Sequence, residues 1–107
     1  MNYFDLIREK FGIILPISGG SGRNIDDPLL INHVNKFSAV FLEYDYLKYM
    51  AKCRNIEYQR TRQVLLFHNE RIIDLLYITI TEGNASYEEN YYFDISESYR
   101  KDDEKND

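Results

Sequence analysis

A stripe of apolar residues between positions 35 and 53 is the clearest pattern in the chain. Along this segment apolar side chains recur every three or four residues, and charged side chains lie between them. The stripe consists of Phe37, Val40, Phe41, Tyr44, Leu47, Met50 and Ala51. Lys52 and Arg54 follow at the end of the segment, where a helix dipole favours positive charge. The pattern predicts a long amphipathic helix whose stripe faces the core.

A second amphipathic pattern, near the N-terminus, predicts a short helix over residues 2–11. Phe4, Ile7 and Phe11 have the i, i+3, i+7 spacing of one helix face. Gly12 is well placed to end this helix, because glycine readily adopts the left-handed conformation found there.

Two short apolar runs lie between the predicted helices. Residues 13–17 are too few for a helix, and Pro16 restricts them to a buried extended segment or an edge strand. Residues 29–31 are typical of another short strand. Either run would add a short strand at the edge of a sheet.

The second half of the chain is rich in β-branched and aromatic residues and predicts three strands. They cover residues 56–67, 72–81 and 86–95. Residues with turn chemistry connect them, at 68–71 and at 82–85. Because both connections are short, two successive hairpins should form an antiparallel meander.

Strand alternation predicts which face of this meander is buried. If Thr81 pairs with Ser86, six apolar or aromatic side chains share one face. These are Leu76, Ile78, Ile80, Tyr87, Tyr91 and Phe93. We expect that face to pack against the long helix. Polar residues point to both faces over 59–63, so the register of the first hairpin is left open.

Together these elements predict an α+β domain over residues 1–96. It contains a short N-terminal helix, one long helix packed on a three-stranded antiparallel meander, and an extra edge strand. In outline this resembles cystatin-like architectures, and an outline of this kind does not carry function. Residues 97–107 have almost no apolar content, so we expect a disordered charged tail.

Charge and composition narrow the classes of function. The 107 residues carry a formal net charge of −5, which disfavours nucleic-acid binding through phosphate neutralisation and suits a basic partner. A single cysteine excludes an internal disulfide, and no apolar run approaches the roughly 20 residues of a membrane span. We expect a soluble, cytoplasmic protein that does not bind a membrane.

A glycine-rich loop raises the question of a phosphate site. It contains Gly19, Gly20, Gly22 and Arg23. The loop lacks the Gly-Lys-Ser/Thr ending of a phosphate loop, and the aspartates at 26–27 would repel an anion. We expect a mobile structural or partner-facing loop, with a ligand role kept as an alternative.

Metal, cofactor and nucleophile chemistry have weak support. His33 and His68 lack nearby partners at metal-ligand spacing, so we read both as surface residues and expect neither metal nor cofactor. Cys53 is expected to be a buried, inert thiol at the end of the long helix. One basic cluster with an aromatic residue weakly suggests a nucleic-acid surface. It consists of Lys52, Arg54, Tyr58, Arg60 and Arg62.

An acidic and tyrosine-rich surface is the strongest functional candidate. Strand alternation exposes four side chains of the last strand on the face away from the predicted core. They are Glu88, Asn90, Tyr92 and Asp94, which we expect to be joined by Glu43, Asp45 and Tyr46 from the long helix. Such a surface suits a basic protein partner. The sequence therefore predicts a small protein-binding module, of inhibitor or immunity type, and a homodimer through the same tyrosines is compatible with it.

The alternative is a small enzyme or ligand-binding protein with a pocket between helix and sheet. Its candidate residues are Asp74, His68, Tyr77 and Arg62. Asp74 interrupts an apolar run, so it either points inward and needs a partner, such as Arg60 or Arg62, or lies in solvent near a turn. We expect the solvent position.

Overall fold

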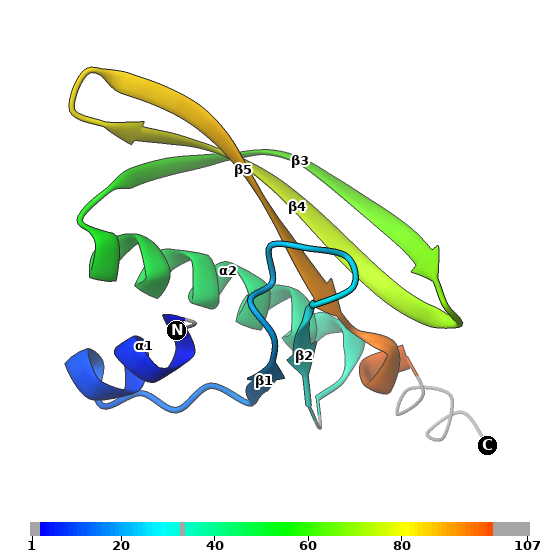
Figure 1. Cartoon of the computed structure of the whole chain (residues 1–107). Coiled ribbons are helices and arrows are strands. Elements are labelled where there is room, and N and C mark those ends of the chain that lie inside the picture. Colours follow the sequence, from blue (N-terminus) through cyan, green and yellow to red (C-terminus); the bar gives the residue numbers. More distant parts are fainter. Residues whose placement is uncertain (1–2, 33, 100–107) are drawn as a thin grey trace.

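The computed structural model describes residues 3–32 and 34–99 of the chain (Figure 1). Two helices and a mixed sheet confirm the α+β class. The elements are α1 (Tyr3–Phe11), β1 (Ile17–Gly19), β2 (Leu29–Ile31), α2 (Lys36–Arg54), β3 (Glu57–His68), β4 (Arg71–Glu82) and β5 (Ala85–Asp94). His33 and residues 100–107 lie outside the described residues, and so does most of the predicted tail.

Both ends of α2 are closed by asparagines. At the start, the side-chain oxygen of Asn35 accepts a hydrogen bond of 2.9 Å from the backbone N–H of Ser38. At the end, Asn55 adopts the left-handed conformation (φ 56°), and its N–H donates to the last carbonyls of the helix. These caps explain why the helix spans the predicted segment almost residue for residue.

The sheet is larger than the predicted meander. β3, β4 and β5 form the expected two hairpins, and Thr81 pairs with Ser86 as predicted. Two further strands extend the sheet to five, in the order β1-β2-β5-β4-β3, and β2 runs parallel to β5. β2 coincides with the short strand predicted over residues 29–31, and β1 begins at the last residue of the predicted run 13–17. The sequence did not predict how they pair, because a parallel pairing between distant segments has no connecting turn sequence.

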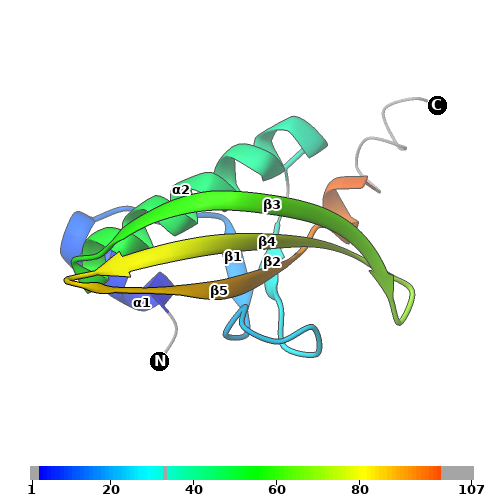
Figure 2. The same ribbon diagram turned by 90° about the horizontal axis from the view of Figure 1, so that it is seen from above.

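The core lies between α2 and one face of the meander, which we call the inner face. Figure 2 shows the long strands bending over the helix. Leu76, Ile78 and Ile80 are at most 1% exposed on this face, as predicted. Tyr46 of α2 packs edge-on against Phe93 of β5, with ring centroids 5.8 Å apart. The opposite side of the sheet is the outer face.

The chain after β5 remains folded beyond the predicted domain boundary. Residues 96–99 form a helical turn, Ser98 is fully buried and Tyr99 packs against the core. Three residues of the predicted tail, 97–99, are therefore part of the folded unit. Within the described ranges, neither helix has the length and apolar character that crossing a membrane requires.

Candidate functional site

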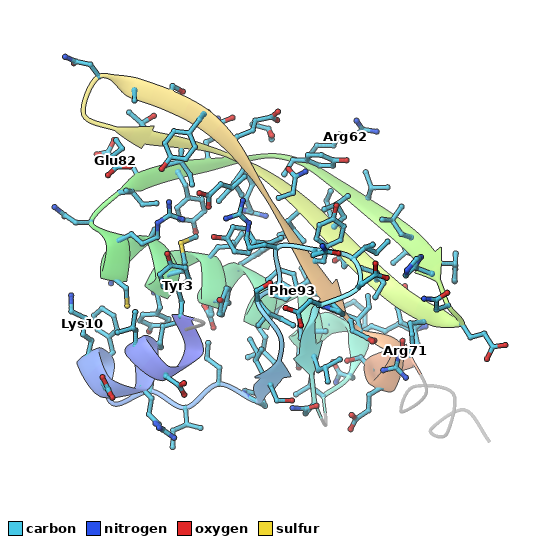
Figure 3. All side chains as sticks on the ribbon, in the orientation of Figure 1. Tyr3, Lys10, Arg62, Arg71, Glu82 and Phe93 are labelled. Carbon is cyan, nitrogen blue, oxygen red and sulfur yellow. The ribbon has the colours of Figure 1, made fainter. Side chains whose placement is uncertain are left out.

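The predicted acidic and tyrosine surface is only partly present on the outer face. Glu88 is exposed, whereas Asn90 and Tyr92 are half-buried. Asp94 is only 4% exposed, because it accepts a hydrogen bond of 2.7 Å from Arg71 at the start of β4 (Figure 3). The expectation that Asp94 projects into solvent was wrong, since its carboxylate joins β5 to β4.

The helix residues assigned to that surface are also displaced. Glu43 and Tyr46 are fully buried and Asp45 is half-buried. By contrast, Phe37 and Phe41, predicted in the core, are 81% and 68% exposed. The sequence located the helix correctly but not the face it buries. Tyr46 lies on the flank that packs against Phe93 of β5, and the two phenylalanines lie outside that contact.

The glycine loop is closed on itself and presents no anion cradle. Asp27 fills the position a phosphate would take, accepting a hydrogen bond of 3.0 Å from the backbone N–H of Ser21. Gly22 adopts a φ of +77° and lies against Leu29. Arg23 donates to the carbonyl of Asn90, at 3.1 Å, and so ties the loop to β5. These contacts hold the loop against β2 and β5.

The basic cluster is likewise dispersed into internal contacts. Arg54 forms a two-pronged ion pair with Glu89, with N···O distances of 2.7 and 3.0 Å. Burial by itself would raise the pKa of Glu89, but the hydrogen bonds from Arg54 and Tyr91 outweigh it and lower that pKa. Arg60 stacks over the Tyr44 ring, 3.5 Å from its centroid. Arg54 is thus taken up by Glu89, whereas Lys52, Arg60 and Arg62 remain exposed.

The four residues of the predicted enzyme site do not meet. Asp74 points to the inner face, while Tyr77 alternates to the outer face, where Arg62 stacks over its ring and extends away from α2 (Figure 3). His68 lies in a separate cleft of about 370 Å³, where Nε2 is 2.9 Å from an Asp26 oxygen. Asp26 is well exposed, so this pair is a surface contact.

An apolar surface, which the sequence analysis missed, opens between α2 and β3. It consists of Phe37, Phe41, Leu65 and Phe67, which we call the apolar rim. Their exposed fractions are 81%, 68%, 44% and 78%. Both phenylalanines of α2 lie on the flank of Tyr44, whose hydroxyl donates to Gln63 of β3. On β3, Leu65 and Phe67 lie on the same inner face as Gln63, because every second residue of a strand points to the same side. The rim therefore has two residues on α2 and two on β3.

The strand at this opening is an edge of the sheet. β3 is last in the strand order, and its part from Gln63 to His68 contains no lysine, arginine or carboxylate. Natural edge strands usually carry charges that prevent pairing with other chains. Here the charges are confined to the first half of the strand, before and around the irregularity between Arg60 and Arg62.

Below the rim lies a pocket of about 400 Å³ between α2, β3 and the turn after β5. Its walls combine apolar side chains with a few polar ones. The lining residues are Lys36, Val40, Gln63, Leu65, Asp74, Ile95 and Tyr99. The expectation of a pocket between helix and sheet thus has a counterpart here, with Asp74 as its one predicted member.

Two carboxyl groups meet behind this pocket: Asp74 lines it, and Glu43 lies beside Asp74 without lining the pocket itself. Asp74 is 4% exposed and accepts a hydrogen bond of 2.6 Å from the side-chain amide of Gln63. Glu43 is fully buried, and its oxygens accept no hydrogen bond from any described residue. Burial, together with the neighbouring Asp74 carboxyl, raises the pKa of Glu43 to about 11. Glu43 therefore keeps its proton at neutral pH and can share it only with Asp74.

The position of Asp74 corrects the expectation that it lies in solvent. Its strand partners are Leu65 on β3 and Phe93 on β5, which places it on the inner face, where it is only 4% exposed. The predicted arginine partners were also wrong, because Arg62 alternates to the other face and Arg60 stacks on Tyr44. The neutral amide of Gln63 takes their place.

Comparisons with known proteins add no assignment. Neither the family models, nor the curated proteins, nor the solved structures contain a match to this chain. Within residues 3–32 and 34–99, His, Cys, Asp and Glu side chains form no group that could hold a metal ion. Cys53, expected to be buried, is half-buried.

Proposed function

We propose that this chain is a protein-binding module that docks a partner protein on the apolar rim and on the adjacent edge of β3. The single observation that carries the proposal is the rim itself, four large apolar side chains left in solvent around one opening. Isolated exposed apolar residues are common, whereas a contiguous group of them marks an interaction surface.

The composition of the rim supports this use. Full burial of a phenylalanine or leucine side chain contributes about 1.5–3 kcal/mol, so covering the rim supplies a substantial driving force for association. Aromatic residues are also enriched among the residues that dominate binding energy. Three of the four rim residues are phenylalanines.

The edge of β3 offers a second means of binding. An extended segment of the partner can add to the sheet beside Gln63–His68, where backbone groups supply affinity and side-chain pockets supply specificity. The pocket between α2 and β3 lies on the inner side of this edge. A partner strand in this position would lie next to Leu65 and Phe67.

The net charge of −5 favours a basic partner, because complementary charge accelerates encounter. The inhibitor or immunity type expected from the sequence is kept as part of this proposal. We place the binding surface at the opening between α2 and β3 and not on the acidic strand face. Three residues assigned to the acidic face are buried, namely Glu43, Tyr46 and Asp94.

Site-specific crosslinking tests the proposal. A photoreactive phenylalanine analogue at position 37 or 67, in the full chain expressed in its native cell, should crosslink one defined basic protein. The same analogue at Ile14, which is 74% exposed but remote in the fold from the rim, is the matched control. The purified partner should then lose at least tenfold in affinity with Phe37→Ser or Phe67→Ser and keep its affinity with Ile14→Ser.

Two results would overturn this assignment. Crosslinking from Ile14 or from the outer face, with none from the rim, would place the interface elsewhere. A rim that crosslinks to a second copy of this chain, with a dimer mass at micromolar concentration that Phe67→Ser abolishes, would make the surface a homodimer interface instead.

A further inference from the structure

We propose that the pocket below the apolar rim receives a lysine or arginine side chain of the partner, with the cationic end against Asp74 and Glu43. This inference rests on the proposed function, because it names the partner group that enters the same opening. It assigns a binding role to two carboxyl groups that the fold itself does not need.

The pocket matches such a side chain in shape and chemistry. Val40, Leu65, Ile95 and Tyr99 form largely apolar walls beside Lys36, and the carboxylate of Asp74 lies deeper, bound by the amide of the exposed Gln63. Lysine and arginine have the complementary distribution, an apolar stem that ends in a cation. An arginine could also donate two parallel hydrogen bonds to a carboxylate.

The carboxyl groups of Glu43 and Asp74 can accept more hydrogen bonds than the fold supplies. The Glu43 carboxyl is buried with only the Asp74 carboxyl to share its proton, and the other described donor to Asp74 is the neutral amide of Gln63. A buried polar group without a partner costs roughly 1–3 kcal/mol. A cationic donor entering from the pocket would provide the missing bonds to the carboxyl pair.

The pair is also expensive to keep in a core. Apolar residues of similar size usually serve at least as well as buried charged groups, so a carboxyl pair held by a single neutral amide suggests a functional role. Glu43 follows Lys36 and Val40 along the same face of α2, one turn deeper than the pocket wall. Asp74, from the sheet, thus lines the pocket, and Glu43, from the helix, is buried behind it.

The other cations around the opening are held over aromatic rings, and the charge of Lys36 opposes an incoming cation. Lys36 lies at the pocket with its ammonium over the Tyr99 ring, 4.2 Å from the centroid. Arg60 stacks on Tyr44, whose hydroxyl is bound to Gln63. A cation against the pair would favour ionised Glu43, so affinity for a guanidinium should rise with pH.

Binding of a small probe tests the pocket without the partner. The probe is n-propylguanidinium, and n-propylurea is its neutral analogue of the same shape. Two-dimensional NMR of the full chain should show saturable shifts at Val40 and at the Gln63 side-chain amide with the guanidinium alone. Asp74→Asn should weaken this binding at least tenfold, whereas Asp26→Asn, at an exposed carboxylate in the separate cleft, should not change it.

The Glu43→Gln variant supplies an independent readout. It keeps the charge of Asp74 but cannot ionise, so its affinity for the guanidinium should stay constant from pH 6 to 9 while that of the unmodified chain rises. Leu65→Trp, at the half-open pocket wall, should block the probe even if Asp74→Asn fails to fold. Equal shifts with the urea, or binding that Leu65→Trp leaves intact, would overturn the proposal.

Failure of this inference is distinguishable from failure of the proposed function. If rim variants lose the partner but the guanidinium does not bind, the docking surface stands and the cationic pocket is rejected. If the guanidinium binds as described but the rim crosslinks to nothing, the pocket serves a free small cation and the partner side chain is rejected.

Discussion

The carboxyl group of Glu43 on α2 lies beside that of Asp74 on β4, so two acids from distant parts of the chain share one buried position. At neutral pH they cannot both ionise there, because burial and mutual repulsion favour a proton on Glu43. This relationship has consequences for stability that are independent of any partner.

Replacing Glu43 by glutamine should change how stability depends on pH. The folded pKa of Glu43, about 11, exceeds the ordinary value of 4.5, so between these values the folded state holds a proton that the unfolded state releases. The contribution of Glu43 to the free energy of unfolding is therefore largest below about pH 4.5. It declines as pH rises, by up to about 1.4 kcal/mol per pH unit. Glu43→Gln should gain stability relative to the unmodified chain from pH 5 to 8, measured by urea unfolding. Glu88→Gln, at an exposed position, is the control and should show no such trend. If the free energy of unfolding depended on pH in the same way for Glu43→Gln and for the unmodified chain, the buried pair would be contradicted.

Replacing Gly22 by alanine should destabilise the glycine loop. A Cβ at this position would lie 2.7 Å from Leu29 Cδ1, and the φ of +77° is unfavourable for alanine. We expect a loss of about 2–3 kcal/mol in the free energy of unfolding. Gly83→Ala is the matched control, since Gly83 has a φ of +62° with open space around it. It should cost about 1 kcal/mol, from the backbone alone, and equal losses at both glycines would refute the close packing at Gly22.

Removing the guanidinium of Arg54 should leave Glu89 without its main partner. The side chains are 18% and 10% exposed, so Arg54→Met should cost about 3 kcal/mol in denaturant unfolding at pH 7. Because the pKa of Glu89 is lowered in the folded state, this stabilisation is present above the ordinary pKa of 4.5 and is lost as pH falls below it. Arg60→Met, which removes only the stack on Tyr44, should cost less than about 1 kcal/mol. A loss at Arg54 that persists unchanged at pH 3 would argue against an ion-pair origin.

The apolar rim should be dispensable for folding. Phe37→Ser and Phe67→Ser remove side chains that are mostly in solvent, so each should alter the unfolding free energy by no more than about 0.5 kcal/mol. Leu47→Ala, at a fully buried position on the same helix, should cost about 2–5 kcal/mol. Similar losses at both kinds of site would show that the rim phenylalanines contribute to the core.

Local patterns were sufficient to locate most elements. The period of the apolar residues predicted α2, and turn chemistry at both hairpins predicted the meander and the pairing of Thr81 with Ser86. These features depend on residues close in sequence, whose spacing and turn preferences act within one helix or one hairpin. The inner face with Leu76, Ile78 and Ile80 followed from strand alternation alone.

The candidate site depended on contacts that local patterns do not encode. α2 carries apolar residues on two flanks, and only the packing of the tertiary structure, with Tyr46 against Tyr91 and Phe93 of β5, leaves Phe37 exposed. Likewise, alternation allowed Asp74 to face inward, but only the helix brings Glu43 to it. The sequence by itself determined the helices, the hairpins and the acidic net charge, because these follow from neighbouring residues. Only the tertiary structure decided which flank is buried, how β2 joins β5 and where two carboxyls meet, because burial depends on what packs from elsewhere in the chain.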